Sequence, residues 1–143
     1  MCGIVGLFLK DRSLEPRLGA MLTDMLITMT DRGPDSAGLA VFGTDSDEEG
    51  KLTVRSADPE ADFDGLETAL GAEIGAEVRL TRRDSHAVLA LPMARLDAAR
   101  EALARLRPGL RIMSAGDIIE IYKEVGLPRD VAARFHLSEM SGR

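Results

Sequence analysis

The first nine residues are the part of the sequence that most constrains how this chain can fold. Residues 2–9 are a continuous apolar run, Cys-Gly-Ile-Val-Gly-Leu-Phe-Leu, that includes β-branched residues. A run of this length and composition is typical of a strand buried on both faces. We therefore predict a strand over residues 2–9.

Cys2 lies at the beginning of this predicted strand and is the only cysteine among the 143 residues. Once Met1 is removed, Cys2 carries a thiol and a free α-amine on the same residue. An α-amine has an unperturbed pKa of about 7.7–8.0, so it can accept the thiol proton directly or through one water. One residue then supplies both the nucleophile and its base. The alternative is that Cys2 packs as a small buried hydrophobe, as free cysteines usually do.

A second motif, Arg-Gly-Pro-Asp-Ser-Ala-Gly, occupies residues 32–38. It follows a predicted helix with apolar residues at helical spacing on one face, which we interpret as core: Leu18, Met21, Leu22, Met25 and Met29. Gly33 and Pro34 end this helix. Arg32 and the Asp35–Ser36 turn therefore lie in a tight loop before a strand predicted for residues 37–44.

Together the two motifs, Met-Cys-Gly-Ile-Val-Gly and Arg-Gly-Pro-Asp-Ser-Ala-Gly, resemble the opening of the class II glutamine amidotransferases. These N-terminal-nucleophile enzymes hydrolyse glutamine to glutamate and ammonia. Residues 18–38 most resemble glutamate-synthase-like amidotransferase subunits, of the kind found in N-methylglutamate synthase. The resemblance implies that Cys2 is the catalytic nucleophile and that Gly3, Arg32 and Gly33 line the substrate site. Without this resemblance, we would interpret Arg32 as a residue that caps the preceding helix by hydrogen-bonding its last carbonyl groups.

Other motifs of that family do not occur in the sequence. The family uses an Asn-Gly pair to bind the oxyanion, a His-Thr-Arg arginine to hold the glutamine carboxylate, and a later aspartate to hold its amine. Loss of one oxyanion donor alone lowers turnover by about 10²–10³. We therefore expect this chain to be the N-terminal part of a longer amidotransferase and to be inactive by itself.

Residues 50–116 show a different order of elements. Alternating and helical patterns predict strands and helices over residues 51–57, 63–74, 76–82, 86–91, 94–107 and 110–114. The order β-α-β-β-α-β is that of a ferredoxin-like split βαβ unit.

We expect an α+β fold with three parts. Residues 1–49 begin a partial N-terminal-nucleophile hydrolase-type αββα sandwich, as the resemblance implies. A ferredoxin-like βαββαβ module is inserted at residues 50–116, and residues 117–143 return as helices at 117–124 and 131–140.

Composition and charge exclude several classes of function. The net charge of −6 disfavours a nucleic-acid partner. A single cysteine excludes an intramolecular disulfide, and the N-terminal apolar run is too short for a secretion signal or a membrane span. We therefore predict a cytoplasmic protein with no membrane partner. The acidic residues between 45 and 64 lack a calcium-loop spacing, and His86 and His136 are interpreted as structural or exposed, so we expect no metal site.

The resemblance also implies partners: glutamine as substrate, and a synthase subunit that accepts the ammonia and carries a flavin and iron–sulfur clusters. One cysteine cannot hold such a cluster, so we expect no cofactor in this chain. Two alternatives stay open. The chain is a non-catalytic module whose insert docks a partner or effector, or it belongs to another class II enzyme that makes amino sugars, purine precursors or asparagine.

Overall fold

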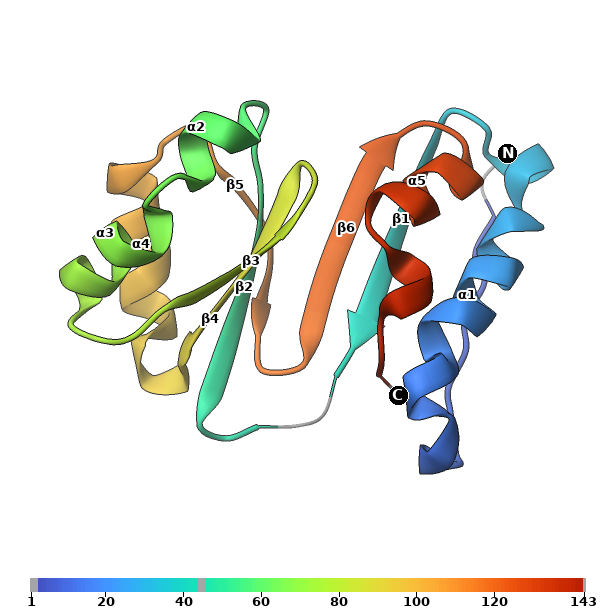
Figure 1. Cartoon of the computed structure of the whole chain (residues 1–143), viewed down its shortest axis with the longest axis horizontal. Coiled ribbons are helices and arrows are strands. Elements are labelled where there is room, and N and C mark those ends of the chain that lie inside the picture. Colours follow the sequence, from blue (N-terminus) through green and yellow to red (C-terminus); the bar gives the residue numbers. More distant parts are fainter. Residues whose placement is uncertain (1–2, 44–45, 143) are drawn as a thin grey trace. The chain divides into compact units, whose positions relative to one another are not determined.

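The computed structural model of this chain describes residues 3–43 and 46–142 (Figure 1). Its contacts divide the chain into two compact units. Unit 1 comprises Met1–Thr44 and Ile121–Arg143, and unit 2 comprises Asp45–Glu120. The sequence prediction put the boundaries after residues 49 and 116 instead. The chain leaves unit 1 once, forms unit 2, and returns.

Unit 1 combines helices with a two-stranded sheet. Its elements are η1 (Arg12–Arg17), α1 (Leu18–Ile27), η2 (Thr30–Arg32), β1 (Ser36–Phe42), β6 (Ile119–Val125, which begins in unit 2), α5 (Pro128–Arg134) and η4 (Leu137–Glu139). β1 pairs with β6, and the two strands run in opposite directions in Figure 1. α1 packs on α5 and η4, and the Gly19 N–H donates to the Met140 carbonyl at 3.0 Å. This hydrogen bond fixes the C-terminal segment against α1.

The core of unit 1 lies between its helices and its strands. Tyr122 of β6 and Phe135, which follows α5, are both fully buried, with ring centroids 5.3 Å apart. The other buried apolar residues are Leu9, Leu18, Ala37, Leu39, Val41, Val131, Ala132, Leu137 and Met140. Of the predicted methionine-rich stripe, only Leu18 is fully buried, whereas its other four members are half-buried. That stripe is therefore only partly core.

The strand predicted for residues 2–9 is wrong over its described part. Residues 3–9 form no strand, and Ile4 and Phe8 are 94% and 65% exposed. Only Leu9 of this segment is buried. The apolar run satisfies the pattern of a buried strand, but a strand also needs a hydrogen-bonding neighbour, and β1 pairs with β6 alone.

The helix predicted for residues 117–124 is also wrong, because β6 occupies Ile119–Val125. The predicted helical return of residues 117–143 therefore begins with a strand. Ile119, Ile121 and Val125 are β-branched, which favours a strand over a helix. The helix predicted for residues 131–140 is present as two pieces, α5 and η4, separated at His136, whose φ is +54°.

Unit 2 has its own sheet and its own core. Its elements are β2 (Glu49–Arg55), α2 (Pro59–Phe63), α3 (Leu66–Ile74), β3 (Arg79–Arg83), β4 (His86–Pro92), η3 (Met93–Arg95), α4 (Leu96–Leu106) and β5 (Arg111–Gly116). The strand order is β3-β4-β2-β5, and each neighbouring pair is antiparallel. α3 and α4 pack on each other and lie on the same side of the sheet (Figure 1).

The predicted helix at residues 63–74 is interrupted at Gly65, whose φ of +62° is readily accessible only to glycine. The helices cover a face of the sheet that includes Leu52, Val54, Ala87 and Leu89, all fully buried. Because successive side chains alternate between faces, the residues between them point to the other face.

Candidate functional site

The loop that connects α1 to β1 is held by local hydrogen bonds. The Thr28 hydroxyl donates to the Met25 carbonyl at 2.7 Å, and the Thr30 hydroxyl donates to the Ile27 carbonyl at 2.6 Å. These bonds satisfy carbonyl groups that the end of a helix leaves without an intrahelical donor. The chain then forms η2, which ends at Arg32, and enters β1 after three residues.

Gly3, the residue after Cys2, lies directly against this loop. A Cβ atom built on Gly3 would overlap the Cε methyl of Met29 and would lie 3.0 Å from Cβ of Arg32. Real Cβ atoms are very rarely packed as closely as this, so a side chain at position 3 would have to displace Met29. The N-terminal segment and the second motif, far apart in the sequence, are therefore in contact.

A pocket of about 260 Å³ opens between these two segments. It is lined by Gly3, Leu26, Met29, Arg32, Gly33, Pro34, Asp35, Ser36, Ala37, Gly38 and Pro128. The three residues that the resemblance implied as site-lining, Gly3, Arg32 and Gly33, are among them. Their role toward a substrate stays a prediction. Arg32 is exposed, and a guanidinium presents planar N–H donors that suit a carboxylate.

Cys2 itself lies outside the described residues, so the position of its thiol does not enter this geometry. The structure places only its neighbour, Gly3, at the rim of the pocket.

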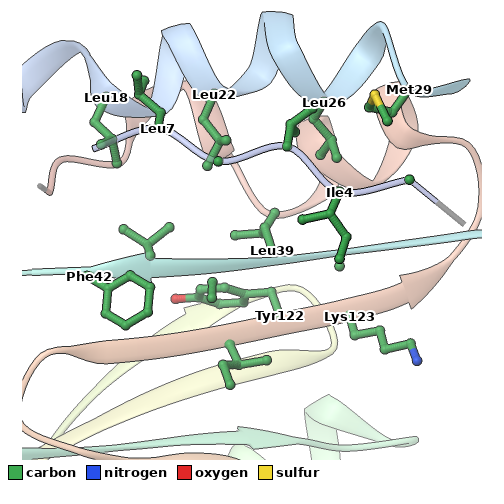
Figure 2. Close-up of a pocket in the computed structure, with 17 residues that line it drawn as sticks. Ile4, Leu7, Leu18, Leu22, Leu26, Met29, Leu39, Phe42, Tyr122 and Lys123 are labelled. Carbon is green, nitrogen blue, oxygen red and sulfur yellow. The ribbon is translucent and has the colours of Figure 1, made fainter. Parts of the chain in front are cut away.

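An apolar cavity of about 470 Å³ adjoins this pocket and shares Gly3, Leu26, Met29 and Gly38 with it. Figure 2 shows Leu18, Leu22 and Leu26 pointing from α1 toward the two strands, where Leu39 and Tyr122 lie. A hydrocarbon-lined space beside a polar loop suits the aliphatic part of a small substrate or a side chain from another polypeptide.

Sequence reasoning missed the residues that residues 117–143 contribute to these pockets, among them Tyr122 and Pro128. Tyr122 lines the apolar cavity, and Pro128 lines the smaller pocket. Both come from the segment predicted to return as helices. The pattern Ile-Glu-Ile-Tyr-Lys-Glu-Val over residues 119–125, with its β-branched residues, was the signal that could have placed Tyr122 on a strand.

The two histidines line neither of these pockets. His86 is fully buried at the start of β4, with Nδ1 3.0 Å from the Ser85 hydroxyl. His136 is exposed, with Nδ1 3.4 Å from a carboxylate oxygen of Glu139. Within residues 3–43 and 46–142, no three or more His, Cys, Asp or Glu side chains are grouped so that they could hold a metal ion. No helix in the described part of the chain has the length and apolar character needed to cross a membrane.

Two curated proteins that match this chain both have glutamine amidotransferase in their names. No family model matches the chain. Glutamine amidotransferase-like protein GlxB of Rhizobium meliloti is 59% identical over 142 residues, which cover 99% of this chain and 47% of that protein. A protein of Methanothermobacter thermautotrophicus, whose name also contains the words glutamine amidotransferase, is 30% identical over 148 residues, with 94% and 47% covered. The chain spans about half the length of these curated relatives. It is thus related, over almost all of its own length, to part of a glutamine amidotransferase-like protein.

Proposed function

We propose that this chain is the nucleophile-bearing part of a class II glutamine amidotransferase, with Cys2 as the catalytic residue. The observation that carries the proposal is the contact of Gly3 with Met29 and Arg32, which brings both halves of the motif pair to one pocket. The relatives named for glutamine amidotransferase support the same reaction class. Glutamine is the proposed substrate, and glutamate and ammonia are the products.

The proposed chemistry needs only the N-terminal residue for its first step. The neutral α-amine of Cys2 takes the thiol proton, and the thiolate attacks the side-chain amide carbon of glutamine. The tetrahedral oxyanion collapses to a thioester, and the amide nitrogen leaves as ammonia with the proton from the amine. Water then hydrolyses the thioester to glutamate and restores the thiol. Both tetrahedral intermediates require hydrogen-bond donors for the oxyanion.

The resemblance to class II glutamine amidotransferases also underlies the fold that we propose. Unit 1, with α1 and α5 packed together beside a two-stranded sheet, is interpreted as part of an N-terminal-nucleophile αββα sandwich. Unit 2 is interpreted as a ferredoxin-like insert, supported by its strand order β3-β4-β2-β5 and by two helices on one face.

We further propose that the ammonia passes to a glutamate-synthase-like subunit in the cytoplasm. The single cysteine of this chain is too few for an iron–sulfur cluster, so the flavin and the clusters are assigned to that partner. This part of the proposal rests on the resemblance of residues 18–38.

The purified chain alone should release no glutamate from glutamine above the background of its Cys2→Ala variant. The oxyanion donors and the substrate clamp expected for the family have no counterpart in its sequence, and loss of one donor alone lowers turnover by about 10²–10³. A glutamate-release assay should detect turnover only when the chain is co-expressed with the polypeptide that corresponds to the relatives' remaining half. Turnover by the chain alone that Cys2→Ala abolishes would contradict this prediction.

Replacing Gly3 by alanine should lower the kcat/KM of the co-expressed complete protein by about tenfold. Misplacing a catalytic group by about 1 Å can lower the rate by at least that factor. The added Cβ would collide with the Met29 methyl and crowd Arg32, so the backbone at position 3, next to the proposed nucleophile in sequence, would have to shift away from the loop. Gly6→Ala is the matched control, because no atom lies within 4 Å of a Cβ at that position. The double variant Gly3→Ala with Met29→Ala removes the colliding methyl and should recover part of the loss. Equal activity of the two alanine variants would show that this contact does not position the nucleophile.

A further inference from the structure

Exposed apolar side chains are concentrated in unit 1. Among the described residues, six large hydrophobic residues are exposed, and five of them belong to this unit. The five are Ile4 (94% exposed), Phe8 (65%), Phe42 (45%), Val125 (76%) and Leu127 (37%). Single exposed hydrophobic residues are ordinary, but a concentration of them is typical of a surface that another molecule covers.

Strand β1 is apolar on both of its faces. Residues 37–42 read Ala-Gly-Leu-Ala-Val-Phe and include no polar side chain. Burial alternates along the strand, so that Leu39 and Val41 are buried whereas Gly38, Ala40 and Phe42 are exposed. An antiparallel strand with one face in water normally alternates apolar with polar residues, and an uninterrupted apolar run is typical of a strand buried on both faces. The composition of β1 therefore indicates that its exposed face is covered in the complete protein.

Strand β6 extends this exposed face. A Cβ atom built on Gly38 would lie 3.4 Å from Cβ and Cγ of Lys123, so these two residues point to the same side of the sheet. Because side chains alternate along a strand, Ile121 and Val125 share that side, whereas Tyr122 points to the other side and contacts Phe135. The face, hereafter the outer face, comprises Gly38, Ala40, Phe42, Ile121, Lys123 and Val125. Only one of these six residues is charged.

The sheet that carries the outer face is small. In the described part of the chain, β1 and β6 pair only with each other, so both are edge strands. A sheet usually needs three or more strands, or cover on an apolar face, to be stable by itself. The free edge of such a strand presents N–H and C=O groups that can pair with a strand from another polypeptide.

The apolar cavity of about 470 Å³ is a further sign that unit 1 is incompletely packed. It is lined by residues 3–7, by Leu22 and Leu26 of α1, and by β1 residues that include Ala40 and Phe42 of the outer face (Figure 2). Protein interiors are packed about as densely as organic crystals, with few voids larger than a water molecule. A hydrocarbon-lined space of this size therefore has room for apolar side chains that the described part of the chain does not supply.

We propose that the outer face and residues 3–9 together form the surface on which the polypeptide corresponding to the remaining half of the relatives docks. That polypeptide is about as long as this chain, because the matched region covers 47% of each relative. Its apolar side chains cover Ile4, Phe42 and Val125 and enter the cavity. Residues 3–9 gain from it the hydrogen-bonding neighbour that no described strand of this chain provides. This inference rests on the relation to a longer protein and not on the reaction proposed for Cys2.

The test co-expresses the full chain with an affinity-tagged form of the part of GlxB that the chain does not match. The wild-type chain should co-purify with it. Ile4→Asp and Val125→Asp should each weaken the association by at least about tenfold, because burial of such a side chain contributes at least that factor. Both side chains are exposed in the chain alone, so its unfolding temperature should not change. Thr81→Asp is the matched control, because Thr81 is an exposed β-branched strand residue of unit 2.

A second measurement does not require the GlxB part to fold separately. In a chimera in which this chain replaces the matched region of GlxB, amide hydrogens of residues 3–9 should exchange at least about tenfold more slowly than in the chain alone, because strand pairing protects them. Ile4→Asp and Val125→Asp should lower the unfolding temperature of the chimera but not that of the chain.

Three results would overturn the proposal. The first is equal co-purification of the wild type, Ile4→Asp and Val125→Asp, and the second is unchanged exchange of residues 3–9 in the chimera. The third is a dimer of the chain alone, seen by light scattering, that Val125→Asp dissociates. That result would assign the outer face to a second copy of this chain.

Discussion

Replacing Cys2 by alanine will lower glutamine hydrolysis by the complete protein by at least about 10³-fold, the loss typical of removing a catalytic nucleophile. The chain contains no second cysteine that could form the thioester. The expected change is in kcat rather than KM, because the substrate contacts stay in place. The measurement is glutamate release by this chain co-expressed with the polypeptide that corresponds to the remaining half of its relatives.

The control for this prediction separates the thiol from the amine. A variant that keeps a residue in front of Cys2, verified by intact mass, retains the thiol but ties up the α-amine in a peptide bond. Because the base is then missing, its rate should also fall sharply. Full activity in that variant would show that another group deprotonates the thiol, and full activity in Cys2→Ala would exclude Cys2 as the nucleophile.

Replacing Gly19 by alanine will lower the free energy of unfolding of unit 1 by about 3 kcal/mol, the upper range for overpacking a tight site. A Cβ at this position of α1 would overlap the Leu137 carbonyl oxygen and would lie 2.6 Å from the carbonyl oxygen of Met140. Backbone atoms cannot move aside as a flexible side chain can. The hydrogen bond from Gly19 N to Met140 O would be strained at the same time.

Helix propensity makes the opposite prediction, because glycine to alanine inside a helix normally stabilises by about 1 kcal/mol. The sign of the change therefore decides between local propensity and tertiary packing. Tyr122 is the only tyrosine and the chain has no tryptophan, so intrinsic fluorescence in a urea titration reports on unit 1. Gly6→Ala, with open space at its Cβ, is the matched control. An unfolding midpoint for Gly19→Ala equal to or above that of the wild type would contradict the packing argument.

The elements of unit 2 could be predicted in order from the sequence. Alternating apolar residues in β2 and β4, the helical spacing in α4 and the turn between Arg83 and His86 are all local patterns. Local patterns of this kind do not depend on which other segment a strand meets. They therefore located the four strands, α3 and α4 to within a few residues, although not α2 or the break at Gly65.

The sequence alone also determined the chemistry available to this chain: one thiol beside the N-terminus, a Gly-Pro-interrupted loop, and too few cysteines for a cluster. Tertiary structure decided which segments pair as strands and which distant residues come into contact. Whether residues 3–9 and 119–125 form strands depends on a hydrogen-bonding partner, and β1 pairs with the second segment rather than the first. The contact of Gly3 with Arg32 and the register of the unit 2 sheet are likewise set by packing and strand pairing. These are relations between residues distant in sequence, which no local periodicity records.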